Sequence, residues 1–268
     1  MAIKFYEEGH KYVSIENDGI EWKSVTSLLS KYKKPFDAEA VAEKCATNRK
    51  SKWYGLTKEE IKAYWKQEVN DAIELGTWYH GQRESDLIEF NSITKQDVLL
   101  PINKPIYSNG VKFAPPQKLK DGVYPEHMVY LKSAGICGQS DRVEVINGVV
   151  DVCDYKTNKE LRTEGYVSWD GVRERLESPL DHLDSCELVT YGLQLSIYMY
   201  IILKHNPKLK PGKLIIEHII FDENPRNKYN VRNLKRDEYG NPIFKEMIRY
   251  EVPYYKEEVI AILNSLKQ

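Results

Sequence analysis

The sequence contains few cysteines and no long hydrophobic run. Its four cysteines include no Cys-x-x-Cys pair and no metal-ligand spacing. Cys137 and Cys153 could face each other across a hairpin, although reduced thiols are the expectation for a cytosolic protein. The apolar run 197–203 is too short to cross a membrane, and the first eight residues have the character of neither a signal peptide nor an anchor. We therefore expect a soluble, cytoplasmic protein with no membrane partner.

Neither sign of charge predominates. The chain has 39 Lys and Arg against 40 Asp and Glu, a formal net charge of −1, which excludes the global positive field of a protein that coats nucleic acid indiscriminately. Basic residues gather locally at 31–34, 49–52 and 226–236. Such clusters are usually solvated surface, but three of them in a neutral chain favour a focused track for an anionic partner.

The 268 residues predict one domain, because neither an internal repeat nor a clear linker divides them. Apolar patterns predict strands at 3–6, 11–15, 126–133, 136–146, 149–156, 214–221 and 249–252. Helices are expected from Ser24 or Thr26 toward residue 35, and at 37–50, 57–90, 187–204 and 256–266. The helix that begins at Thr57 should break at Gly76-Thr77. Segments 91–122 and 157–186 should be irregular, the first with room for short strands.

One predicted hairpin carries the strongest functional signal. Asn147-Gly148, a pair typical of two-residue hairpin turns, joins two predicted strands. Asp141 lies on the first strand, and Asp154 and Lys156 end the second, two residues apart and therefore on one face. Two carboxylates beside a lysine can hold a divalent cation against a phosphate. The plainer alternative is a surface ion pair at a strand end, since so short a motif also arises by chance.

Two helical segments supply further polar candidates. His80 and Glu84 lie four residues apart on one face of the first, where an imidazole beside a carboxylate could complete the coordination of a cation. Zinc is not favoured, because there is no His-Glu-x-x-His or cysteine ligand set. In the second, Gln194 and Tyr198 share a face with Tyr191 and could contact the backbone and a base of a nucleotide. A structural histidine, and a glutamine that satisfies a buried polar group, are the plainer alternatives.

These candidates occur in a fixed order within residues 76–198: Gly-x-x-x-His-x-x-x-Glu, Gly-x-x-Asp, Asp-x-Lys and Gln-x-x-x-Tyr. This order resembles the RecB-like branch of the PD-(D/E)xK nuclease superfamily. Segments 24–29 and 191–195 extend the likeness to small phage-encoded and mitochondrial-type exonucleases. The resemblance implies an α/β fold like that of restriction endonucleases, in which helices flank a central mixed β-sheet and the metal site lies at one sheet edge.

The resemblance also implies roles for individual residues. Lys156 would be the catalytic lysine, acting with Asp141 and Asp154. The groups that would bind the cation, Mg²⁺ or Mn²⁺, are His80, Asp141, Asp154, the backbone carbonyl of Tyr155 and, as an additional acidic residue, Glu126. The residues that would support the site or hold DNA are Glu84, Gln194, Tyr198, Tyr191 and Ser24. No iron–sulfur cluster is expected, because no late group of three cysteines follows Cys45.

The implied activity is metal-dependent DNA hydrolysis from a strand end, in DNA recombination, repair or degradation, within a host-cell cytoplasm if the chain is phage-encoded. Residues 1–268 would form one nuclease domain, with a DNA-contacting N-terminal part (1–56) and a catalytic core (57–268). Phosphate contacts are expected from Lys33, Lys34, Arg49 and Lys52. Single-stranded DNA or strand ends would be the substrate, and a helicase or recombination protein a partner. A structure-specific endonuclease and a non-catalytic DNA-end-binding module are the alternatives.

Overall fold

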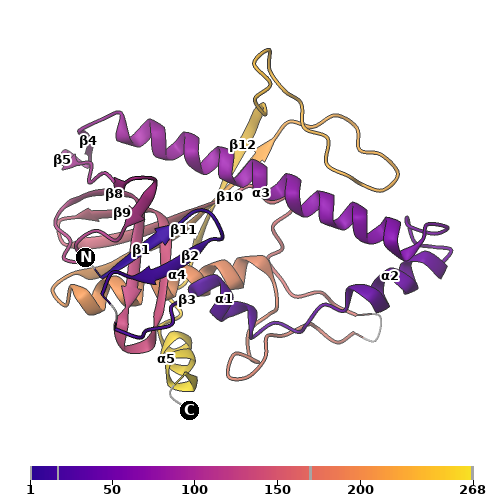
Figure 1. Ribbon diagram of the computed structural model, residues 1–268, viewed down its shortest axis with the longest axis horizontal. Coiled ribbons are helices and arrows are strands. Elements are labelled where there is room, and N and C mark those ends of the chain that lie inside the picture. The colour runs from indigo at the N-terminus through magenta and orange to yellow at the C-terminus, as the bar shows by residue number, and fades with distance from the viewer. Residues whose placement is uncertain (1, 17, 169–170, 267–268) are drawn as a thin grey trace.

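The computed structural model describes residues 2–16, 18–168 and 171–266. The described residues form one large mixed sheet and two small antiparallel sheets, together with five α-helices (Figure 1). The helices are α1 (Val25–Ser30), α2 (Ala38–Thr47), α3 (Lys58–Ile88), α4 (Glu187–His205) and α5 (Lys256–Ser265). The strands are β1 (Ile3–Tyr6), β2 (Lys11–Ser14), β3 (Lys23–Ser24), β4 (Ser92–Lys95), β5 (Val98–Pro101), β6 (Ile106–Ser108), β7 (Val111–Phe113), β8 (Gly122–Leu131), β9 (Ile136–Ile146), β10 (Val149–Lys156), β11 (Lys210–Phe221) and β12 (Phe244–Val252). The expected α/β class, a mixed sheet flanked by helices, is confirmed.

The large sheet has the strand order β12-β11-β10-β9-β3, and β8 pairs along β9. Strands β8, β9 and β10 form an antiparallel meander, whereas β10 and β11 run parallel and are joined through α4. Asn147 and Gly148, between β9 and β10, have φ angles of +51° and +74°. A type I′ turn requires positive φ at both central positions, so the hairpin predicted from these two residues is confirmed.

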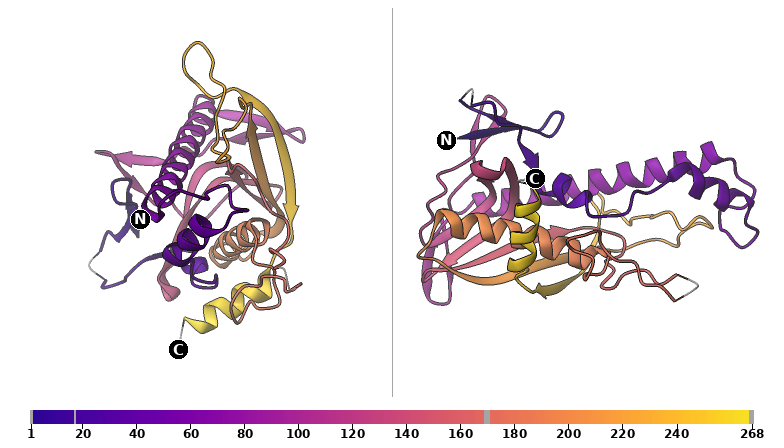
Figure 2. Two further views of the ribbon diagram at one scale, coloured as in Figure 1. Left: turned by 90° about the vertical axis from the view of Figure 1, so that its right-hand side faces the viewer. Right: turned by 90° about the horizontal axis from the view of Figure 1, so that it is seen from below.

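Helices cover both faces of the large sheet (Figure 2). On one face, Leu193 and Ile197 of α4 join the main hydrophobic core with strand residues such as Val152. On the other face, Leu75 of α3 packs with Ile219 of β11. Burial of these side chains, each worth about 1.5–3 kcal/mol when complete, fixes the two helices on the sheet. None of the described helices is long and apolar enough to cross a lipid bilayer.

Helix α3 is continuous over 31 residues, so the break expected at Gly76-Thr77 is wrong. Its start is as predicted: Thr57 is the N-cap, and its side chain and that of Glu60 form a reciprocal capping box. A glycine within a helix costs only about 1 kcal/mol relative to alanine, which the hydrogen bonds of the remaining turns outweigh. A Cβ atom at Gly76 would lie 3.7 Å from Thr157 Oγ1, so this position also touches the chain that follows β10.

Segment 91–122 contains four short strands, more regular structure than the mostly irregular loop expected. Two-residue turns with positive φ, Gln96-Asp97 and Asn109-Gly110, connect β4 with β5 and β6 with β7. Strand β7 also pairs with β1, which gives a small sheet of order β2-β1-β7-β6. The N-terminal hairpin predicted at 3–15 is therefore present, but it is one half of a larger sheet.

The cysteines do not pair. In the β8–β9 and β9–β10 registers, Cys137 lies opposite Tyr130 and Cys153 lies opposite Arg142. The expectation that Cys137 and Cys153 could face each other is wrong, because they are at different positions along the hairpin. All four cysteines are free thiols.

Candidate metal centre

Three acidic residues form a row across adjacent strands of the large sheet. Glu126 and Asp141 lie between the β8–β9 pairs Pro125–Arg142 and His127–Ser140, and Asp154 directly follows Cys153, the last residue of β10 that pairs with β9. All three side chains line the same cavity. The three residues are buried, with exposed fractions of 6% for Asp141, 7% for Glu126 and 2% for Asp154. Like charges so arranged repel one another, so the row needs positive charge beside it.

The row lies where β9 and β10 separate. Their pairing ends at Arg142 and Cys153, while β10 continues beside β11 as far as Lys156. In the opening, the backbone N–H of Tyr155 donates to Asp141 Oδ2 at 2.5 Å. The backbone therefore fixes one oxygen of Asp141, and the other oxygen, Oδ1, is directed to His80. The role of the Tyr155 backbone carbonyl as a ligand stays a prediction.

Glu126 enters the site through an unusual backbone conformation. Its φ angle is +47°, a region that residues other than glycine seldom adopt and that costs of order 1 kcal/mol or more. The Gln139 side chain donates to Glu126 Oε2, so the carboxylate is held with Oε1 toward His80. Strain of this kind is tolerated where it places a functional group.

His80 completes the group from helix α3. Its Nδ1 atom lies 3.2 Å from Asp141 Oδ1 and 3.9 Å from Glu126 Oε1, and one ligand atom from each residue lies within 4.8 Å of the others. Ligands about 2.1 Å from Mg²⁺ are roughly 3 Å apart when adjacent and roughly 4 Å when opposite. The donor set and its spacing therefore fit one small divalent cation. Asp154 lies outside this closest group.

The acidic row controls the ionisation of its neighbours. Burial disfavours the imidazolium, but Asp141, Glu126 and Asp154 outweigh it and raise the pKa of His80 to about 11. Burial, reinforced by Asp141, raises the pKa of Asp154 to about 6. Burial also opposes the charge on Lys156, yet Asp154 and Asp141 raise its pKa above the ordinary value. The cluster therefore attracts positive charge strongly.

Lys156 occupies a partly buried position at the end of β10. Its ammonium forms an ion pair with Asp154, and the side chains of the two residues are only 16% and 2% exposed. Lys156 Nζ also lies 4.7 Å from the ring centroid of Tyr191, whose hydroxyl accepts a hydrogen bond from Asn158 Nδ2 at 2.7 Å. The pair is thus not the surface ion pair that the sequence left open.

Gln194 and Tyr198 lie behind the site on α4. Gln194 Nε2 donates to the Tyr198 hydroxyl at 3.0 Å, and both residues are buried. The Tyr198 ring packs against Gly138 so closely that a Cβ atom there would lie 2.5 Å from Tyr198 Cε1. This packing leaves no room for a base to stack on the tyrosine. Of the two roles expected, the geometry favours support of the site.

Replacing Gly138 with alanine is expected to lower the free energy of unfolding by about 1–3 kcal/mol, because overpacking must displace the Tyr198 ring. Urea titration would measure the change. Gly81→Ala is the matched control: nothing lies within 4 Å of a Cβ there, and the interior of α3 should gain up to about 1 kcal/mol. A Gly138→Ala variant as stable as the wild type would contradict the close packing.

Nine of the sequence candidates line one cleft of about 520 Å³, whereas Tyr155 and Tyr191 do not line it. The predicted residues that line it are Ser24, His80, Glu84, Glu126, Asp141, Asp154, Lys156, Gln194 and Tyr198. Glu84 accepts a hydrogen bond from the Tyr107 hydroxyl at 3.1 Å. Ser24 is the N-cap of α1, and its side chain accepts from the Ser27 N–H at 3.1 Å. The N-terminal part of the chain therefore contributes to the same cleft as the central sheet.

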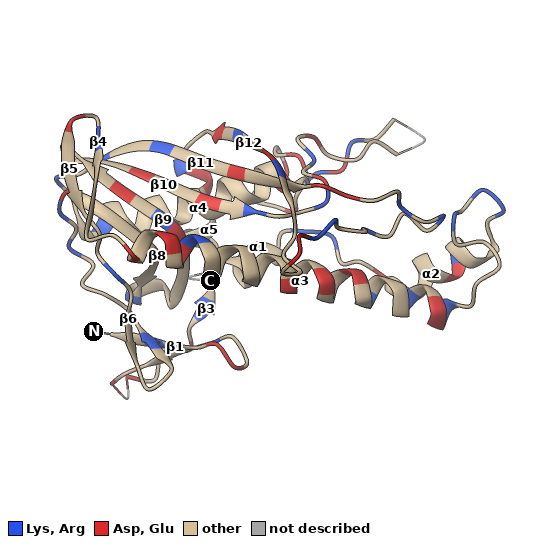
Figure 3. Cartoon of the chain, turned by 90° about the horizontal axis from the view of Figure 1, so that it is seen from above, with Lys and Arg blue, Asp and Glu red and all other residues tan. Residues whose placement is uncertain are grey.

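The basic residues expected to contact phosphates lie elsewhere. Lys33 and Lys34 lie between α1 and α2, and Arg49 and Lys52 follow α2 on the loop that Figure 3 shows beyond the far end of α3. All four are exposed, and none lines the cleft. Lys52 donates to the backbone carbonyl of Tyr229, so it holds the 222–243 segment. If these residues contact phosphates, the DNA-binding surface must extend well beyond the cleft.

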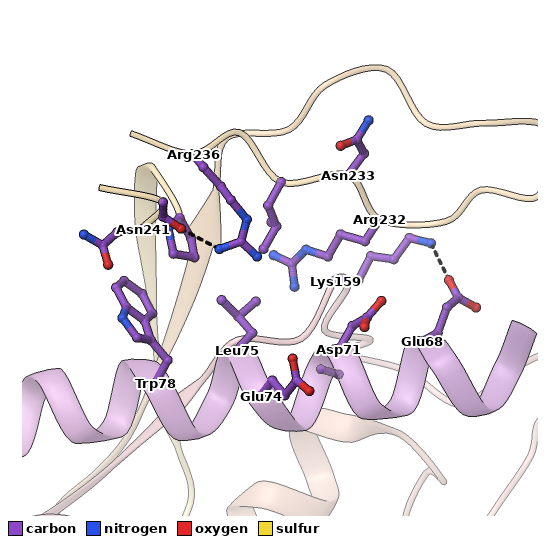
Figure 4. Close-up of a pocket in the computed structure, with 14 residues that line it drawn as sticks. Glu68, Asp71, Glu74, Leu75, Trp78, Lys159, Arg232, Asn233, Arg236 and Asn241 are labelled. Carbon is purple, nitrogen blue, oxygen red and sulfur yellow. Dashed lines mark hydrogen bonds and ion pairs between the residues drawn. The ribbon is translucent and has the colours of Figure 1, made fainter. Parts of the chain in front are cut away.

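A second cavity, of about 570 Å³, lies between α3 and segment 232–242 (Figure 4). Both signs of charge line it, and several of these charges already have partners. Lys159 Nζ lies 3.6 Å from Glu68 Oε1, and Arg232 donates to Glu223 and to the Thr157 carbonyl. Arg232 and Arg236 of the basic cluster at 226–236 line this cavity, but none of the residues to which the resemblance gives a role does.

Several polar residues of the cleft were not expected from the sequence, among them Lys112 and Gln139. Lys112 lies on β7 between Val111 and Phe113 and is only 3% exposed. The Asn109-Gly110 pair before it is a hairpin signal. Even with that hairpin recognised, period-two alternation puts Val111 and Phe113 on one face and assigns Lys112 to the opposite, solvent-facing side. Its burial therefore has no local signal in the sequence.

Comparisons with known proteins add no identification. No family model matches the chain, and no curated protein matches it. Among solved structures that match, one described as "Crystal structure of SSO0001" shares 18% sequence identity, with 97% of this chain and 80% of that chain covered. The TM-score is 0.35, a likeness too slight to support any statement about this protein.

Proposed function

We propose that this protein is a metal-dependent DNA exonuclease that hydrolyses phosphodiester bonds from a strand end. The observation that carries the proposal is the convergence of His80, Glu126 and Asp141 within 4.8 Å, in a cleft that also contains Asp154 and Lys156. A cation held by carboxylates beside a fixed lysine suits a substrate whose charge must be neutralised during attack, as in phosphodiester hydrolysis.

The architecture supports the same proposal. An antiparallel meander, β8 to β10, leads through α4 to the parallel strand β11. This order brings Asp141 and Asp154 to the point where two central strands separate, with α4 packed behind them. We propose that it is the restriction-endonuclease-like arrangement of the PD-(D/E)xK nucleases, in the RecB-like branch that the sequence motifs resemble.

The ligands proposed for the cation are His80, Glu126 and Asp141, with Asp154 beside them. Three carboxylates and one imidazole suit Mg²⁺ or Mn²⁺, and the nitrogen shifts the preference toward Mn²⁺. The bound ion would supply a Lewis acid for a phosphate oxygen and lower the pKa of a water.

Lys156 is the proposed catalytic lysine. Because Asp154 and Asp141 raise its pKa, its side chain stays an ammonium at neutral pH and can donate to a phosphate oxygen as negative charge develops there. The water oxygen bonds to phosphorus while the bond from phosphorus to the 3′ oxygen breaks. One proton of the water ends on that 3′ oxygen, which leaves a 5′-phosphate on the product.

Mg²⁺ affinity is expected to rise about tenfold per pH unit between pH 7 and pH 9. His80, with a pKa of about 11, is protonated throughout this window and must lose its proton to bind a cation. Asp154, with a pKa of about 6, is already ionised in this window and therefore adds nothing to the pH dependence of Mg²⁺ affinity. Isothermal titration calorimetry at several pH values would measure the effect. A pH-independent affinity over this range would show that His80 is not a ligand.

The activity is tested by digestion of end-labelled single- and double-stranded oligonucleotides, each blocked at one terminus, with Mg²⁺ or Mn²⁺ and with EDTA. The proposal predicts cation-dependent release of mononucleotides or short products from an unblocked end. A circular single-stranded DNA should resist degradation. Cleavage of the circle, or of flaps and junctions only, would favour an endonuclease. DNA binding without cleavage under any of these conditions would favour a non-catalytic module.

A further inference from the structure

The small sheet β2-β1-β7-β6 forms a second wall of the cleft, opposite the end of β10. Phe5, Tyr12, Tyr107 and Lys112 are the strand residues through which it lines the cavity. Lys112 is the charged member of this set. In the registers of β7 it lies opposite Phe5 of β1 and Tyr107 of β6, where an apolar side chain would be the ordinary choice.

The contacts of Lys112 within the protein are not those of a structural ion pair. Its Nζ atom lies 3.8 Å from Glu126 Oε2, too far for a hydrogen bond, and Gln139 already donates to that oxygen. The Tyr107 ring centroid is 5.6 Å away. Among the described residues no hydrogen bond to its ammonium is found. Burial lowers the pKa of Lys112, while Glu126 and other nearby carboxylates favour the charged form.

Lys112 and Lys156 lie at opposite ends of the acidic row. Lys112 is next to Glu126, the outermost carboxylate on β8, and Lys156 is next to Asp154, the outermost carboxylate on β10. Three neighbouring strands, each about 4.8 Å from the next, separate the two ends. A nucleic acid strand that crosses the row would therefore meet one buried ammonium on each side of Asp141.

We infer that Lys112 binds a phosphate of the DNA on the opposite side of the cation group from Lys156, and that the small sheet is thus part of the substrate site. This inference rests on the proposed nuclease function. The ammonium has three donors, and a phosphate oxygen is the acceptor that its buried position lacks. Lys112 holds the phosphate next to the one that is cleaved, so it governs DNA binding more than the chemical step.

The test compares Lys112→Met with the wild type on an end-labelled single-stranded oligonucleotide. KM should rise roughly 10- to 100-fold, the usual loss for a charge-assisted hydrogen bond, with a smaller change in kcat. The Mg²⁺ concentration for half-maximal activity should stay the same or fall, because a positive charge near the cation is removed. Binding can be measured without cleavage in a Lys156→Ala background. There, Lys112→Met should make the slope of log binding constant against log salt concentration shallower by about 0.7.

Two variants serve as controls. Lys112→Arg should recover most of the lost affinity, and Lys11→Met, which removes an exposed lysine of the same small sheet, should leave KM unchanged. An unaltered KM and an unaltered salt slope in Lys112→Met would overturn the inference. If Lys112 only balanced the charge of Glu126, its removal would change the Mg²⁺ concentration needed for activity but not the binding of DNA. If Lys112→Met does not fold, unaltered KM in Lys112→Gln decides against it in the same way. If the wild type neither cleaves nor binds DNA, the proposed function fails and the inference falls with it.

Discussion

Lys156→Met is expected to lower the rate of DNA cleavage by roughly 10²- to 10³-fold, the usual cost of removing one group that stabilises transition-state charge. The substitution removes the buried ammonium that pairs with Asp154 and lies over the Tyr191 ring. DNA binding should persist, because the other contacts of the cleft remain. Single-turnover digestion of an end-labelled oligonucleotide would measure the rate, and fluorescence anisotropy would measure the binding.

The matched control for this variant is Lys208→Met, which removes an exposed lysine between α4 and β11. It should cleave at the wild-type rate. Thermal unfolding of both variants would show whether a loss of activity reflects a loss of folded protein. A Lys156→Met enzyme that is as active as the wild type would contradict the catalytic role assigned to this lysine.

Asp141→Asn is expected to lower cation-dependent cleavage by roughly 10³-fold or more, since a bound cation supplies several kcal/mol of stabilisation. The two oxygens of Asp141 have different partners: Oδ2 accepts from the Tyr155 N–H, and Oδ1 is directed to His80. An asparagine must keep its carbonyl oxygen on that N–H, because its amide would place two donors against each other. The amide then points to the cation position, where it cannot be a ligand.

Because the backbone contact survives, Asp141→Asn should fold as the wild type does while its Mg²⁺ affinity falls at least tenfold. Calorimetric titration with Mg²⁺ would measure the affinity. Asp86→Asn is the control: Asp86 lies on α3 but is exposed and pairs with Arg83. Wild-type Mg²⁺ affinity in Asp141→Asn would show that the cation, if it binds, is held elsewhere.

Local signals in the sequence predicted most of the elements. Ser24, Asp37 and Thr57 are the N-caps of three helices, as their residue types suggested. The Asn147-Gly148 turn sets the register of β9 with β10, and Asp141 and Asp154 each lie one residue beyond the last pair of that register, Arg142 with Cys153. The central pair of carboxylates could therefore be predicted, because one short-range turn determines it.

Other features depend on contacts between distant segments. The resemblance names Glu126 as a ligand, but the positive φ angle with which it enters the site is disfavoured by its residue type and is specified only by the assembled sheet. Lys112 reaches the cleft because β7 pairs with β1, more than 100 positions earlier in the chain. Gly76 suggested a break in α3, but intrinsic propensity is a weak signal that the rest of a long helix overrides.

His80, Glu126 and Asp141 are expected to bind one divalent cation together, and anomalous scattering from crystals soaked in Mn²⁺ would locate it. We expect a manganese peak roughly 2.0–2.4 Å from His80 Nδ1, Asp141 Oδ1 and Glu126 Oε1, and no such peak in crystals of Asp141→Asn. A saturating soak that leaves this position without a peak, or that places manganese only outside the cleft, would show that these three residues are not the ligands.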